Sequence, residues 1–148
     1  MRITDEKERV LGIIAAVGAV LSGFLPWASA VTVLGRIDVT GFDTGGKAVL
    51  IAALGVVSLI VLVIELAAFW PAYVTAASGL VILWVAGGQL SESRTAVTTA
   101  DGVATGAHFT TGVGLYLAVA SGAALLGCAI VAWKRDRALY YWIGSGRR

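Results

Sequence analysis

The run GVGLYLAVASGAALLGCAIVAW, residues 112–133, decides the fold class because it has no charged side chain and is followed at once by the charged segment 134–137. A helix needs about 20 apolar residues to cross the hydrocarbon core of a bilayer. Three further apolar stretches are long enough, and with this run they predict spans at about 10–27, 48–68, 71–90 and 112–133. We therefore expect residues 1–148 to form one integral membrane domain, an all-α up-down bundle of four transmembrane helices.

The composition excludes most other classes of protein. Apolar residues make up 58% of the chain and charged residues 14%, against roughly 45–50% and ~25% in soluble domains. Eleven Lys and Arg against nine Asp and Glu leave no basic excess of the kind that nucleic acid attracts, so no nucleic-acid partner is expected. The single cysteine, Cys128, excludes an internal disulfide and is expected to pack inside the fourth span.

The positions of the cationic residues predict the orientation. Eight of the eleven lie before the first span or after the fourth, so the positive-inside rule places both termini in the cytoplasm. The connections 28–47 and 91–111 then lie outside. The expected location is a prokaryotic cytoplasmic membrane, and the membrane of an enveloped particle is the alternative.

Both outer connections have the pattern of a β-hairpin. β-Branched and small residues flank Gly35-Arg36 in the first connection and Asp101-Gly102 in the second. Asp-Gly suits the positive φ values of a type I′ turn. Because an isolated hairpin is only marginally stable in water, we expect the two hairpins to pair into one small antiparallel sheet.

An internal repeat is a further hypothesis. Phe42-Asp43-Thr44-Gly45 precedes the second span, and Phe109-Thr110-Thr111-Gly112 precedes the fourth, 67 residues later; Gly55 and Gly122 match at the same offset. The pattern suggests duplicated helix–hairpin–helix units at 1–68 and 72–135. Chance identity in so biased a composition is the alternative.

Small residues four apart form stripes on the first and fourth spans: Ala15, Ala19 and Gly23, and Gly114, Ala118 and Gly122. Small side chains let membrane helices approach closely. We expect these stripes to pack within the bundle, with a second copy or a larger partner as the alternative.

Aromatic residues near the predicted span ends are candidate membrane anchors: Trp27, Trp70, Trp133, Tyr140, Tyr141 and Trp142. The segment 134–148 combines such residues with cations. We expect it to lie in the lipid headgroup layer, and a tail that docks a partner is the alternative.

Few residues are candidates for a role in ion transport, catalysis or metal binding. No span has an ionisable side chain at its middle, which argues against a pump or selective channel. The outer-loop candidates Asp38, Asp43, Asp101 and His108 would come together only if the hairpins pair. These carboxylates lack the spacing of a calcium-binding loop, and no nucleophile motif accompanies the histidine. We expect no catalytic residue, no metal and no cofactor.

Two short motifs resemble those of small uncharacterised four-span membrane proteins of bacteria and archaea. They are Gly23-Phe24-Leu25-Pro26-Trp27, with its Leu-Pro-Trp after the first span, and 111–117, TGVGLYL, at the start of the fourth. The outline is also similar to claudins in topology, although the paired loop cysteines of a claudin are missing. These resemblances imply a bundle with an outer sheet and no particular activity.

The leading functional hypothesis is a non-enzymatic scaffold or accessory subunit in the lipid bilayer. It would assemble as a homo-oligomer or with a larger membrane complex. One alternative is permeation of a small or lipidic solute between protomers. Another is a membrane enzyme that uses the outer loops.

Overall fold

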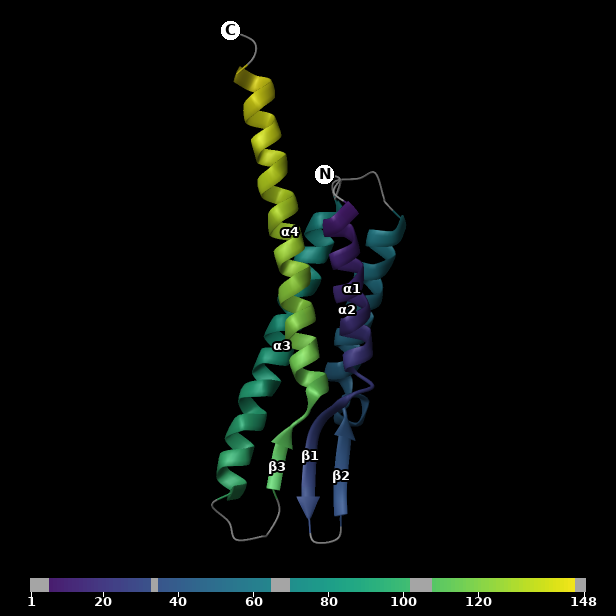
Figure 1. Ribbon diagram of the computed structural model, residues 1–148, viewed down its shortest axis with the longest axis vertical. Coiled ribbons are helices and arrows are strands. Elements are labelled where there is room, and N and C mark those ends of the chain that lie inside the picture. The colour runs from purple at the N-terminus through teal and green to yellow at the C-terminus, as the bar shows by residue number, and fades with distance from the viewer. Residues whose placement is uncertain (1–5, 33–34, 65–69, 102–107, 146–148) are drawn as a thin grey trace.

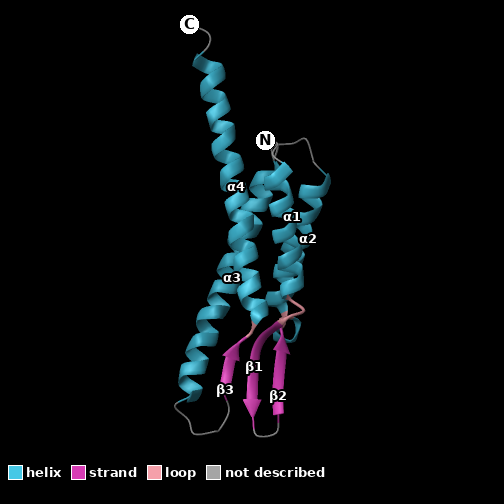
Figure 2. Ribbon diagram, viewed as in Figure 1, coloured by secondary structure: helices cyan, strands magenta, loops and turns pink. Residues whose placement is uncertain are grey.

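The computed structural model describes residues 6–32, 35–64, 70–101 and 108–145 (Figure 1). The chain forms, in order, α1 (Glu6–Ser22), β1 (Pro26–Thr32), β2 (Gly35–Thr40), the short 3₁₀ helix η1 (Phe42–Thr44), α2 (Gly46–Ile64), α3 (Trp70–Asp101), β3 (His108–Thr111) and α4 (Val113–Ser145). The strands form one antiparallel sheet, which lies beyond one end of α1, α2 and α4 and beside the C-terminal part of α3 (Figure 2). The predicted helical bundle with a small sheet is confirmed at this level.

Three helices in the described part of the chain are long and apolar enough to cross a membrane: Gly46–Ile64, Ala72–Glu92 and Val113–Lys134. This indicates a membrane protein. Helix α1 has 17 residues, or about 25 Å at 1.5 Å per residue, which is less than the hydrocarbon core of about 30 Å. The first span is predicted at 10–27, but the helix ends at Ser22 and Pro26 already begins a strand.

Glycines set how closely the helices approach. A Cβ added to Gly79 of α3 would lie 2.9 Å from the carbonyl oxygen of Gly122 on α4, and one added to Gly55 of α2 would lie 3.0 Å from that of Ala16 on α1. Backbones this close gain dispersion contacts, which drive helix association where the solvent is as apolar as the side chains. The pairs α1–α2 and α3–α4 are thus held by direct backbone packing.

The first predicted hairpin is confirmed, but its turn lies elsewhere. β1 pairs antiparallel with β2, with Ser29 opposite Asp38 and Thr32 opposite Gly35. Gly35 and Arg36 are therefore strand residues, and the connection between the strands is 33–34, which lies outside the described residues. Gly35 has φ +129°, a conformation that favours glycine.

The second predicted hairpin is wrong. Residues 94–101 continue α3, so Asp101 ends a helix, and only β3 joins the sheet, in the order β2-β1-β3. Extending an existing helix adds one hydrogen bond per residue without a new nucleation cost. A strand over 94–100 would need a partner, and the side of β1 that is not paired with β2 is paired with β3. The proposed turn residue Gly102 lies outside the described residues.

The two halves of the predicted repeat are alike at some positions and differ at others. Gly55 and Gly122 both lie at helix crossings. Residues 94–99 are helical, however, whereas residues 27–32, which lie 67 positions earlier, are in β1, and Phe42 begins η1 whereas Phe109 lies in β3. The duplication stays a hypothesis.

The span predicted at 112–133 nearly coincides with the apolar part of α4, Val113–Lys134, and the helix itself runs unbroken beyond it to Ser145. Figure 1 shows its C-terminal part extending well beyond the other three helices. A segment lying along a bilayer surface would have to turn near Lys134, and the helix has no break there. The placement of 134–145 in the headgroup layer stays a prediction, as does the alternative that this segment docks a partner.

Candidate functional site

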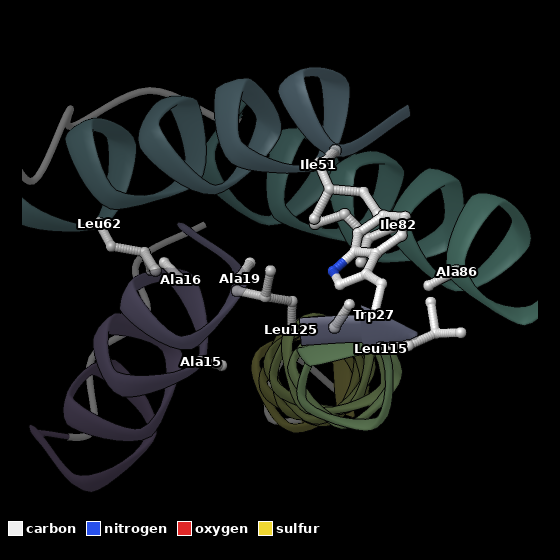
Figure 3. Packing of buried hydrophobic residues seen from close by; sticks show 12 residues of the cluster. Ala15, Ala16, Ala19, Trp27, Ile51, Leu62, Ile82, Ala86, Leu115 and Leu125 are labelled. Atoms are coloured by element: carbon white, nitrogen blue, oxygen red, sulfur yellow. The ribbon is translucent and has the colours of Figure 1, made fainter. Parts of the chain in front are cut away.

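The junction between sheet and helices is built around Trp27. Its side chain is only 2% exposed and lies among residues from three helices, Ile51, Ile82 and Leu115 (Figure 3). The indole Nε1 donates a hydrogen bond of 2.9 Å to the carbonyl oxygen of Ser22, near the end of α1. The expectation that Trp27 anchors the protein in the headgroup layer is wrong, because the indole is packed inside the protein.

Glycines make room for this tryptophan. A Cβ on Gly41 would lie 2.6 Å from Nε1 of Trp27, and one on Gly114 would lie 2.8 Å from Cδ1 of the same indole. A Cβ on Gly112 would overlap the carbonyl group of Pro26. Gly112 also donates its backbone N–H to the carbonyl oxygen of Trp27 at 2.8 Å. The two motifs noted in the sequence, 23–27 and 111–117, thus pack against each other and fix the sheet to α4.

The six small-residue candidates lie inside the chain. Ala15, Ala19, Gly23, Gly114, Ala118 and Gly122 are all buried. Gly23 lies against the ring of Phe42, and Gly122 lies against Ile82 and Leu83 of α3. These stripes are used within the bundle, as expected, and do not present a surface to a second copy.

Asp38 and Asp43, the two outer-loop candidates whose side chains are described, have local structural partners. Asp38 accepts a 2.5 Å hydrogen bond from the hydroxyl of Ser29 across the β1–β2 pair. Asp43 accepts hydrogen bonds from the Thr40 hydroxyl at 2.7 Å and the Thr40 backbone N–H at 2.9 Å. These bonds stabilise the charged form, so the pKa of Asp43 lies below its ordinary value of 3.8.

The four outer-loop candidates are not shown to form one cluster. Asp101 ends α3 and His108 begins β3, and the side chains of both lie outside the described residues. Among the residues that are described, no three His, Cys, Asp or Glu side chains gather as a metal site would require.

The other aromatic candidates lie on α3 and α4. Trp133 is 45% exposed near the end of the span Val113–Lys134. Trp70 is the first residue of α3, and Tyr140, Tyr141 and Trp142 lie in the extension of α4. The side chains of these four residues are outside the described set.

An exposed face of α3 was missed by the sequence analysis. Tyr73, Leu80 and Trp84 are all more than half exposed, and Trp84, at 80%, lies near the middle of the span Ala72–Glu92. Ala77 and Gly88 lie on the same face and are also exposed. The opposite face of α3, with Ile82 and Ala86, is fully buried. A helix that is apolar all round gives no sequence signal for which face points outward.

No protein-family model matches the chain, and no curated protein matches it significantly.

Proposed function

We propose that this chain is a non-enzymatic, four-span protein of a prokaryotic cytoplasmic membrane that serves as a scaffold or accessory subunit of a larger membrane complex. Both termini would lie in the cytoplasm and the sheet outside. In this arrangement α1 is the first of the four spans, added to the three helices that are long enough by themselves, and its continuation through 23–25 towards β1 completes the crossing. The cations at both ends of the chain support this orientation.

The proposal rests on the exposure of the Trp84 side chain near the middle of a candidate span. Tryptophan is enriched at the two membrane–water interfaces, where its N–H meets water or headgroups. At mid-span, the largely exposed indole of Trp84 would direct its N–H towards lipid tails, which offer no acceptor. A neighbouring transmembrane helix supplies both an acceptor and a packing surface, so this side chain favours a protein partner over lipid.

The residues around Trp84 also suit a helix partner. Gly87 and Gly88 have open space where a Cβ would lie, with no atom of the described residues within 4 Å. Inside the bundle the corresponding space at Gly79 and Gly122 is filled by the neighbouring helix. Small residues beside a large one let a second helix approach closely, so we infer that a partner helix packs across Ala77, Trp84 and Gly88.

The outer sheet favours an unlike partner. β2 is an edge strand of the described sheet and carries Ile37 and Val39, both exposed. The strands run along the long axis of the helices (Figure 2), so a two-fold axis along the membrane normal would set two β2 strands parallel and level. In a regular parallel pair, the residues whose backbone N–H and C=O groups face the partner lie at different levels on the two strands. A two-fold axis would put these residues at the same level, so two copies of β2 could not form such a pair. An extended segment of a different chain can pair with such an edge.

The test is the mass and composition of the assembly after mild-detergent extraction from the source membrane, for the wild type and two variants. Trp84→Leu removes the indole and keeps an apolar side chain at mid-span. Trp133→Leu is the matched control, because it makes the same change at a span end. We expect the wild type and Trp133→Leu to keep the same co-purifying chains, and Trp84→Leu to lose them.

A second pair of variants tests the outer sheet. Ile37→Lys on the edge strand β2 should weaken the assembly, and Thr110→Lys on β3 should leave it intact. A wild-type protein that is monomeric in native mass measurements, or an assembly that Trp84→Leu does not change, would contradict the proposal.

A further inference from the structure

A groove of about 480 Å³ lies between α1 and α4. Its walls are Leu11, Ile14 and Leu21 on α1 and Leu117, Ala120 and Ala124 on α4, together with their neighbours. The one hydroxyl-bearing residue in the lining, Ser121, is only 4% exposed, so the groove presents hydrocarbon almost throughout. Its volume is within the range of ligand pockets, about 300–1,000 Å³.

The groove continues to a charged mouth. A second hollow of about 410 Å³ is lined by Glu6, Lys7 and Val10 and shares Leu11 and Ile14 with the groove. Glu6 and Lys7 are exposed at the start of α1. The adjacent Arg9 is already engaged, because its side chain donates to the carbonyl oxygens of Leu62 and Val63 on α2. The carboxylate of Glu6 and the ammonium of Lys7 therefore lie at the mouth of the apolar groove.

We propose that this groove binds one acyl chain of a zwitterionic phospholipid whose headgroup carries a primary amine. The phosphate of this lipid lies at Lys7 and its amine at Glu6. The inference rests on the membrane placement in the proposed function. From Leu11 to Leu21 the groove follows ten residue steps of α1, about 15 Å at 1.5 Å per residue. Half of a hydrocarbon core of about 30 Å is the same depth, so the groove matches one leaflet's acyl chain.

The groove differs chemically from the exposed face of α3. Trp84 brings an exposed hydrogen-bond donor to mid-span, which lipid tails cannot satisfy, whereas the one hydroxyl in the lining of the α1–α4 groove, that of Ser121, is almost fully buried. The opposite charges at its mouth complement a headgroup that carries both a phosphate and an amine. An anionic headgroup without an amine would leave Glu6 beside a like charge.

The experiment uses the full chain reconstituted in vesicles of equal parts phosphatidylethanolamine, phosphatidylcholine and phosphatidylglycerol. Bound lipid is then identified by native mass spectrometry after gentle detergent release. Ala120→Phe fills the groove, and Ala123→Phe is the matched control, because Ala123 is an exposed alanine of α4 outside the groove. Ala124→Leu is a second, smaller groove-filling change. Glu6→Gln tests the headgroup.

We expect the wild type and Ala123→Phe to retain one phosphatidylethanolamine, and Ala120→Phe and Ala124→Leu to lose it. Glu6→Gln should still bind lipid but no longer prefer phosphatidylethanolamine to phosphatidylcholine. Equal retention by Ala120→Phe and Ala123→Phe, a preference for phosphatidylglycerol, or a lipid-free dimer would each overturn the proposal. Trp84→Leu should keep the lipid, so loss of partner chains and loss of lipid are separate results.

Discussion

Trp27 connects the two parts of the molecule through a single side chain. Trp27 is a residue of β1, but its indole is buried among the helices. The indole N–H donates a hydrogen bond to the carbonyl oxygen of Ser22, which lies in the last turn of α1. The last four carbonyls of a helix have no partner within the helix. Burying Trp27 therefore supplies apolar contact area and also satisfies a carbonyl at the end of α1.

Gly114 should be intolerant of even one added methyl group. Its Cβ would lie 2.7 and 2.8 Å from the carbonyl oxygens of Ser22 and Leu25, which are backbone atoms that cannot rotate away. We expect Gly114→Ala to destabilise the protein by about 1–3 kcal/mol, the usual cost of overpacking. Gly127→Ala on the same helix is the control, since no atom from the other described helices or strands lies within 4 Å of its Cβ position. Thermal unfolding in detergent micelles measures both, and equal melting temperatures would contradict the packing account.

Asp43 should make a small contribution to stability that depends on pH. Because its pKa is lower in the folded state than its ordinary value of 3.8, the contribution is complete above that value and is lost as pH falls through the folded pKa. The carboxyl is exposed, so the effect is small. We expect Asp43→Asn to melt slightly below the wild type at pH 7, with the difference shrinking below pH 3.8. A difference that stays constant down to pH 2 would show that the charge of Asp43 is not its source.

At the scale of elements, Arg9 holds the end of α2 to the start of α1. Its Nε lies 3.2 Å from the carbonyl oxygen of Leu62, and its Nη2 lies 3.3 Å from that of Val63. Both carbonyls are in the last turn of α2, where intrahelical partners are missing and a cation is favourable. The planar guanidinium reaches two acceptors at once, which an ammonium does less well.

Arg9→Met should therefore destabilise the protein by about 1 kcal/mol, the order of one net hydrogen bond. Arg9→Lys keeps the charge and should recover only part of that loss. Denaturant or thermal unfolding in micelles compares the three proteins. Full recovery by lysine would mean that charge alone, and not the forked geometry, stabilises this end of α2.

At the scale of the whole molecule, the orientation proposed for the bundle can be tested by labelling. With Cys128→Ala as background, Ile37→Cys on the sheet and Lys134→Cys at the far end of the span Val113–Lys134 place one thiol on each side. A membrane-impermeant maleimide should label Ile37→Cys in intact cells and Lys134→Cys only after permeabilisation. The opposite pattern would reverse the orientation, and labelling of both in intact cells would contradict a bundle with its ends on two sides of a membrane.

Apolar helices long enough to cross a membrane could be predicted because hydrophobic length is a local property. Residues 48–64 and 112–133 contain no charge, and a helix is the only way for such a segment to satisfy its own backbone in lipid. The small-residue stripes could be predicted for the same reason, since their spacing follows from the helical repeat. The ends of α3 and α4 could not, because beyond the apolar run helix and strand compete through distant contacts.

Which side chains are exposed on the candidate surfaces depends even more on contacts between residues that are far apart in the chain. Trp27 and Trp84 are the same residue type in apolar surroundings, yet the first is buried and the second almost fully exposed. The difference comes from Gly41 and Gly114, which leave space for one indole, and from the way α3 turns Ile82 inward. No periodicity in a uniformly apolar helix encodes that rotation.

Residue type and runs of neighbouring residues were enough to predict a chain that is apolar, helical and long enough to cross a bilayer. Three other results needed the folded molecule: the described residues make a sheet of three strands rather than four, Trp27 fixes the sheet to the bundle, and particular sides of the helices face outward. Each of these results depends on segments far apart in the chain competing for the same space and the same hydrogen-bond partners, as β3 and residues 94–101 would for the edge of β1.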